Sequence, residues 1–195
     1  NWWESGAVFN CATLYDEHRV HMLYRAVGEY ENYVSRLGYA SSPDGYSFTR
    51  LNEMVFSPTA DYERFGIEDP RLVQVDSQIY VTYVVLSNHA REGPTVSSAL
   101  AITENYHEFQ RLGIITSSGS DNKDVVIFPD KMMSALSKNG ASNKTNGASC
   151  YFSLQRPSSW IGSSYGIARP CIWLAESSSK LTNFDKYKIL LEPKE

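Results

Sequence analysis

Residues 38–51 read GYASSPDGYSFTRL, and the same pattern returns at residues 99–112 as ALAITENYHEFQRL. Each copy has an apolar strand, a Ser or Thr, a polar turn and an aromatic residue that begins the next strand. A third copy begins at residues 173–177 as WLAES and reaches Phe184. The alanines that end the strands are Ala40, Ala101 and Ala175, which gives offsets of 61 and 74 residues. Self-similarity at such a period indicates a repeat architecture.

Other short strands lie between the copies of this pattern. Runs rich in β-branched and aromatic residues, separated by Gly, Pro, Asn, Asp and Ser, predict strands, and long helices are not expected. The clearest runs are residues 20–25, 79–85, 125–128 and 150–154. Units of about 60 residues with about four short strands each are typical of propeller blades. Two stacked β-sandwiches are the alternative that the pattern leaves open.

The longer second interval contains a segment of biased composition. Residues 134–149 are rich in Ser, Asn, Gly, Ala and Lys, which predicts an inserted surface loop. At about 60 residues per blade, the chain accommodates about three blades and this insertion. We therefore expect residues 1–195 to form a single β-propeller domain that is incomplete.

The composition argues against several classes of protein. The chain has 195 residues, with 18 Lys and Arg against 22 Asp and Glu, a formal net charge of −4 and 42% hydrophobic residues. These values argue against disorder and against nucleic-acid binding, which usually requires a strongly basic domain. Membrane helices need about 20 apolar residues, and no run approaches that length. Cys11, Cys150 and Cys171 form no CxxC pair, so reduced thiols in a cytoplasmic protein are expected.

The densest charged segment is ERFGIEDPR at residues 63–71, directly before a predicted strand. Pro70 is expected to hold Asp69 in an extended conformation. Because side chains alternate along a strand, Glu68 and Asp69 should then point in opposite directions, so that only one of them faces a given pocket. Arg71 should lie on the side of Asp69, where it can hold that carboxylate and contact a substrate. An ordinary charged turn is the alternative interpretation.

Polar residues also gather at the ends of other predicted strands. They are DNKD at residues 121–124, QRP at 155–157, FNCA at 9–12 and YRA at 24–26. In a propeller, strand ends converge on the axial face. Arginine and lysine side chains around one carboxylate suit an anionic co-substrate such as phosphate, which a guanidinium binds in bidentate fashion.

Taken together, these motifs resemble those of glycoside hydrolase family 130, the β-mannoside phosphorylases and their hydrolytic relatives. The resemblance covers about residues 6–193. Its most specific parts are FGIEDPR at residues 65–71 and NKDVVIFP at residues 122–129. Supporting parts are YRAVG at 24–28, SRLGYA at 35–40 and IWLA at 172–175. Five motifs in the family's order are more specific than any one of them.

The resemblance implies an all-β fold, a five-bladed β-propeller with its sugar site at the axial end, of which about three blades lie in this chain. It implies that Asp69 is the general acid, which passes its proton through a sugar hydroxyl to the glycosidic oxygen. Asn10 and Arg25 correspond to residues of the sugar site, and we add Arg71 as a third substrate-binding residue.

Lys123 and Arg156 correspond to residues that bind phosphate. A phosphorylase uses a nucleophile that is already anionic, so it needs positive charge where an inverting hydrolase needs a second carboxylate as base. One acid and two cations fit the inverting phosphorolysis of a β-mannoside to α-mannose 1-phosphate. The expected partners are a β-mannoside oligosaccharide and inorganic phosphate as co-substrate, with no metal, other cofactor, nucleic acid or membrane.

Departures from the family pattern leave alternatives open. Cys11 stands where the family has proline or serine, and Gln155 stands where it has histidine. Family members continue into roughly two more blades, which supply further phosphate and sugar ligands. A β-mannoside hydrolase and a non-catalytic carbohydrate-binding propeller fragment are therefore the competing functions. Acceptor specificity depends on loops and neighbouring subunits in this family, so homo-oligomerisation also stays open.

Overall fold

In the computed structural model, residues 1–90, 93–116, 121–134, 149–157 and 171–194 are described. Strands dominate this part of the chain, and its two helices are short 3-10 turns. Neither helix is long and apolar enough to cross a membrane. The elements in chain order are η1 (Trp2–Glu4), β1 (Ala7–Tyr15), β2 (Val20–Val27), β3 (Ser35–Ser42), β4 (Thr49–Arg50), η2 (Asp61–Glu63), β5 (Ile67–Val75), β6 (Gln78–Ala90), β7 (Gly93–Thr103), β8 (Gln110–Ile114), β9 (Asn122–Ile127), β10 (Met132–Met133), β11 (Ser149–Pro157), β12 (Ile172–Ser177) and β13 (Lys186–Leu191).

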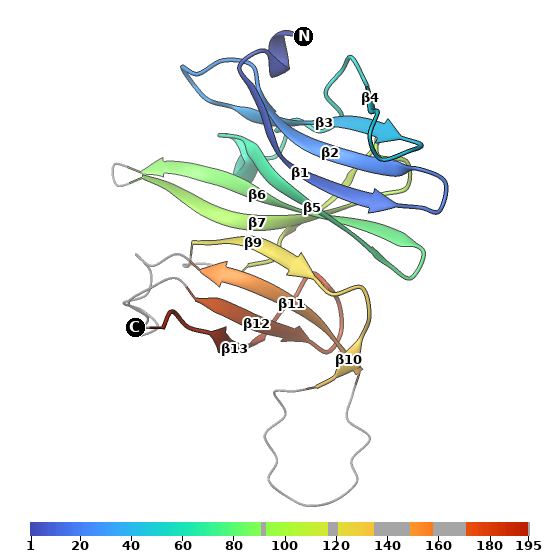
Figure 1. The fold of residues 1–195 in the computed structure, drawn as a ribbon. Helices are drawn as coiled ribbons and strands as arrows, with labels where there is room; N and C mark the ends of the chain where they lie inside the picture. The colour runs from blue at the N-terminus through green and yellow to red at the C-terminus, as the bar shows by residue number, and fades with distance from the viewer. Residues whose placement is uncertain (91–92, 117–120, 135–148, 158–170, 195) are drawn as a thin grey trace, which may run out of the picture.

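These strands form three antiparallel sheets that follow one another along the chain (Figure 1). The first sheet has the order β1-β2-β3-β4 and the second the order β5-β6-β7-β8. In the third sheet β11 pairs with β9 and β12, β12 pairs with β13, and the short β10 pairs with the start of β11. Two sandwiches would need four sheets, and the described residues form three successive antiparallel sheets, which confirms the expected partial propeller. Of the predicted inserted loop, residues 135–148 lie outside the described residues.

The turn that follows the next-to-last strand of each sheet, β3, β7 or β12, is built in the same way. The hydroxyls of Ser42, Thr103 and Ser177 each accept hydrogen bonds from the backbone amides two and three residues further on, at 2.8 to 3.4 Å. Such a bond satisfies amides that the strand ladder leaves free and stabilises a tight turn. The three hydroxyl residues are separated by the same 61 and 74 residues as the sequence repeat, which confirms the repeat.

Apolar side chains fill the spaces between adjacent sheets. One cluster joins the first sheet to the second, and another joins the second sheet to the third. The first cluster contains Leu37, Phe56, Ile67, Tyr83, Val85, Ala99 and Ala101, and the second contains Val75, Leu100, Ile115, Val125, Ile127, Ala175, Leu181 and Phe184. Hydrophobic burial therefore fixes the order and spacing of the blades.

Glu63 is a fully buried carboxylate beside the first of these clusters. It accepts hydrogen bonds from Arg111 Nε at 2.8 Å and from the Tyr83 hydroxyl at 2.8 Å. The backbone amides of Thr59 and Ala60 donate to it at 2.9 and 3.1 Å. Burial alone would raise the pKa of Glu63, but these bonds, led by the one from Arg111, outweigh burial and hold the pKa below its ordinary value.

We predict that Glu63→Gln lowers the free energy of unfolding by about 3 kcal/mol at neutral pH, because Arg111 loses its buried counter-charge. The lowered pKa means that this stabilisation is fully present above the ordinary value of 4.5 and is lost as the pH falls further. Urea unfolding of both proteins at pH 7 and in acid measures the difference. Glu53→Gln, at an exposed position, is the control. A difference that grew with acidity would contradict the assignment.

Candidate active site

The first strand of each sheet contains one residue in the left-handed backbone region. These residues are Asn10 in β1 with φ 45°, Asp69 in β5 with φ 46° and Asp124 in β9 with φ 60°. Each lies where the pairing with the neighbouring strand shifts register. A β-bulge of this kind adds an unpaired residue and redirects its side chain. The bulged strands are adjacent, since β1 contacts β5 and β5 contacts β9.

The three bulges place their side chains at one cavity of about 310 Å³. Asn10 Nδ2 donates to Asp69 Oδ1 at 2.7 Å, which joins the first sheet to the second. The lining residues are Asn10, Cys11, Asp69, Pro70, Arg71 and Asp124. Asn10 and Asp69 are 59 positions apart in the sequence, and Asp69 and Asp124 are 55 apart. Their meeting at one site agrees with the expected convergence of strand ends.

Arg25, on β2, binds the carboxylates of both Glu68 and Asp69. Its guanidinium donates to Glu68 Oε1, to Asp69 Oδ1 at 3.0 Å and to Ser35 Oγ at 2.8 Å. It also lies over the ring of Phe9, 4.6 Å from the ring centroid. Only 7% of Arg25 is exposed, and a buried guanidinium needs several such partners to offset its lost hydration.

Three expectations for the charged segment are wrong. The backbone of Asp69 is left-handed and not extended, although a following proline such as Pro70 favours the extended conformation. The resulting bulge breaks side-chain alternation, so Glu68 and Asp69 both reach Arg25 and do not point apart. Arg71 does not pair with Asp69 either, because its guanidinium lies 3.6 Å from Asp124 Oδ1. Arg71 lines the cavity, and its binding of substrate stays a prediction.

Glu68 differs electrostatically from the carboxylates on the cavity wall. Burial raises the pKa of Glu68 above its ordinary value, and the charge of Asp69 adds to this effect. The positive charges of Arg25 and Lys123 act in the opposite direction, as does the hydrogen bond from Ser35. Because Glu68 does not line the cavity, we interpret it as a partner of Arg25 and not as a group that contacts substrate.

The predicted phosphate residues lie side by side in the third sheet. Arg156 on β11 is the register partner of Lys123 on β9. Arg156 Nε donates to Asp124 Oδ2 at 3.0 Å, and Arg156 Nη2 forms an ion pair with the same oxygen at 2.8 Å. The roles of Glu68, Ser35 and Asp124 were missed from the sequence. For Asp124, a spacing close to that of Asn10 and Asp69 was the available signal.

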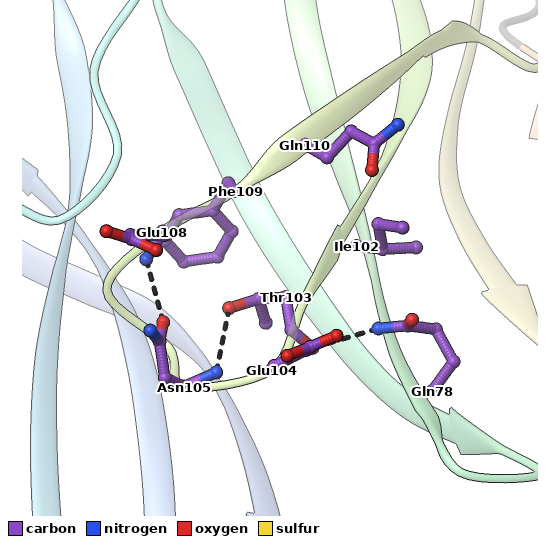
Figure 2. A pocket seen from close by; sticks show the side chains of 8 residues that line it. All are labelled: Gln78, Ile102, Thr103, Glu104, Asn105, Glu108, Phe109 and Gln110. Atoms are coloured by element: carbon purple, nitrogen blue, oxygen red, sulfur yellow. Dashed lines mark hydrogen bonds between the residues drawn. The ribbon is translucent and has the colours of Figure 1, made fainter.

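A second hollow of about 310 Å³ lies at the other end of the second sheet (Figure 2). It is formed where β6 begins and where β7 turns into β8, whereas Asp69 lies near the start of β5. Its walls are held by local bonds, such as those from Gln78 Nε2 to the Thr103 carbonyl at 3.1 Å and from the Glu108 amide to Asn105 Oδ1 at 2.9 Å. It shares no residue with the cavity at Asp69, so we do not assign it to the same site.

Comparison with known proteins decides the family. The model of glycoside hydrolase family 130, described as beta-1,4-mannooligosaccharide phosphorylase, matches residues 3–195. The chain belongs to this family. A 1,2-beta-oligomannan phosphorylase from Thermoanaerobacter sp. (strain X514) is 37% identical over 137 residues, which are 68% of this chain and 45% of the relative.

Solved structures of the family share the fold. The β-1,2-mannobiose phosphorylase from Listeria innocua, in complex with β-1,2-mannobiose, has a TM-score of 0.71 and 24% identity, and the match covers 96% of this chain and 60% of that one. A structure reported for family 130 glycoside hydrolases that target β-1,2 mannosidic linkages in Candida mannan has a TM-score of 0.66 and 25% identity, covering 98% and 54%. The chain therefore spans less than two thirds of each relative. Family 130 proteins are five-bladed β-propellers, and the three sheets correspond to part of one.

We predict that Arg25→Met destabilises the folded protein by about 3–5 kcal/mol at neutral pH, because Glu68 and Asp69 lose their shared counter-charge. Without Arg25 the pKa of Glu68 rises further, so the destabilisation relative to the natural protein is smallest near pH 4 and grows as the pH increases to about 7. Thermal unfolding over this pH range measures the effect. Arg19→Met, at an exposed position, is the control. Equal destabilisation of the Arg25 variant at every pH would contradict the proposed charge network.

Proposed function

We propose that this protein is a β-mannoside phosphorylase, which cleaves a β-mannosidic bond with inorganic phosphate and releases α-mannose 1-phosphate with inversion. The observation that carries the proposal is that one cavity brings together Asp69, Asn10 and an arginine-bound carboxylate, Asp124. Membership of family 130 and the names of the curated relatives support the same reaction. Those names also favour a β-1,2 linkage in the substrate.

Asp69 is the proposed general acid. It lines the cavity and its carboxylate is oriented by Asn10 at 2.7 Å and Arg25 at 3.0 Å. A catalytic acid must lie within reach of the group it protonates, directly or through one intervening hydroxyl. Because Asp69 is hydrogen-bonded to Arg25, transfer of its proton to the glycosidic oxygen through an intervening sugar hydroxyl fits this geometry. Asn10, on the cavity wall, is the better placed of the two neighbours to contact the sugar.

Lys123 and Arg156 are the proposed phosphate ligands. They are register partners on β9 and β11, and Asp124 links Arg156 to the cavity that contains Asp69. Two cations near the anomeric carbon would hold phosphate against its own charge, which is the main requirement of a phosphorylase. The attacking phosphate oxygen forms the new bond to that carbon while the glycosidic oxygen leaves and takes the proton from the acid.

Hydrolysis is the second candidate because Asp124 gives the cavity a second carboxylate. An inverting hydrolase needs such a group, free to activate water, opposite its acid. Asp124 is instead paired with Arg156 at 2.8 Å and lies 3.6 Å from Arg71, so two guanidinium groups engage its oxygens and it is not free to position water. The pairing therefore favours phosphorolysis.

The reaction is tested with the whole natural protein and either β-1,2-mannobiose or β-1,4-mannobiose, each with and without phosphate. We expect mannose 1-phosphate from the β-1,2 substrate only when phosphate is present, as measured by chromatography of the products. Free mannose without phosphate would support the hydrolase. Failure to act on either substrate, with or without phosphate, would support a binding role.

For the acid, we predict that Asp69→Asn lowers kcat by about 10²–10⁴. The amide keeps the shape of the side chain but does not supply the proton. Asp76→Asn is a matched control, since Asp76 directly follows the same strand, is exposed and also has a positive φ of 55°. Steady-state rates of phosphorolysis measure both variants. Normal activity of the Asp69 variant would refute its role as the acid.

A further inference from the structure

We propose that Asp124 is a positioning residue, which holds Arg156 for the phosphate and adds Arg71, predicted above only to bind substrate, as a second arginine for the same anion. This inference rests on the proposed phosphorylase function, because it takes phosphate as the anion. It assigns a role to a carboxylate on the cavity wall that would otherwise repel the co-substrate.

The backbone of Asp124 is the first argument. Asn10 and Asp69 reach the cavity from left-handed bulges in the first strands of their sheets, and Asp124 does the same in the third sheet with φ 60°. A left-handed conformation is uncommon for a residue other than glycine and is retained where the surroundings over-determine it. On β11, Gln155 lies opposite the two residues of this bulge, so the register shift directs Asp124 towards the cavity.

The contacts of Asp124 are the second argument. Its Oδ2 accepts a hydrogen bond from Arg156 Nε at 3.0 Å and lies 2.8 Å from Arg156 Nη2, so two nitrogens of that guanidinium face the same oxygen. Its Oδ1 lies 3.6 Å from Arg71 Nη2, on the neighbouring sheet. One carboxylate thus orients two guanidinium groups from different blades and leaves them with a net positive charge.

The exposure of these groups distinguishes positioning from support of the fold. The side chains of Arg71, Arg156 and Asp124 are 49%, 38% and 25% exposed. Ion pairs this exposed contribute little to the stability of a protein. An arginine has many rotamers, however, and ordering it beforehand reduces the entropy lost when an anion binds. Loss of Asp124 should therefore weaken phosphate binding and leave folding almost unchanged.

Steady-state kinetics of the whole natural protein test this assignment. For Asp124→Asn we expect the KM for phosphate to rise about 10-fold, as loss of a charged hydrogen-bond partner predicts. The KM for the mannoside should stay within about 2-fold and kcat at saturating phosphate within about 3-fold, because Asp69 is untouched. Asp130→Asn, at an exposed position beyond the end of β9, is the control.

Two further measurements separate positioning from other roles. Calorimetric titration with inorganic phosphate should show the same loss of affinity in Asp124→Asn without any turnover. In an Arg156→Met background, Asp124→Asn should have a smaller effect on the KM for phosphate than in the natural protein, because the positioned group is already missing.

Each outcome bears on one of the two proposals. An unchanged or lower KM for phosphate in a folded Asp124→Asn variant overturns the positioning role and leaves the phosphorylase function intact. Full additivity with Arg156→Met also overturns it. Hydrolysis by the natural protein that Asp124→Asn abolishes would make Asp124 a base and refute both proposals. A natural protein that neither binds phosphate nor consumes it refutes the phosphorylase function itself.

Discussion

The left-handed bulge at Asp69 is the constraint on which the site depends. In a regular strand, Glu68 and Asp69 would face opposite sides of the sheet, and one arginine could not bind both. The bulge lets both carboxylates reach Arg25 while Asp69 still lines the cavity. A left-handed residue other than glycine costs about 1–3 kcal/mol. The hydrogen bonds that Asp69 accepts from Asn10 and Arg25 offset that cost.

Arg25 and Asp124 extend this arrangement across the blades. Arg25 belongs to the first sheet and binds two carboxylates of the second, while Asp124 belongs to the third and lies beside Arg71 of the second. The apolar clusters between the sheets set their separation, and charge pairs at the cavity then set the orientation of the polar side chains. Packing alone does not specify a direction, whereas hydrogen bonds do. Apolar packing therefore determines how far apart the sheets lie, and hydrogen bonds and ion pairs determine how the side chains at the cavity are oriented.

The sequence predicted the blades well because the features that define them are local. The Ser or Thr that begins each turn, at Ser42, Thr103 and Ser177, bonds to amides only two and three residues away. The conformation of Asp69 could not be read in the same way, since its bulge depends on pairing with β6 and on partners in another sheet. The rule for residues before proline even predicted the opposite. The ion pair of Arg71 was missed for the same reason.

Two glutamates, the fully buried Glu63 and the half-buried Glu68, show how stability and function are divided within the chain. Glu63 receives four donors in addition to its packing, so its pKa is lowered and it stabilises the interface between the first two sheets. Glu68 shares Arg25 with Asp69, so burial is not fully compensated and its pKa is raised. Hydrogen bonds therefore outweigh the burial of Glu63 in the core, whereas they do not outweigh the burial of Glu68 beside the cavity. Arg25 is divided between these two carboxylates, and only one of them, Asp69, lies on the cavity wall.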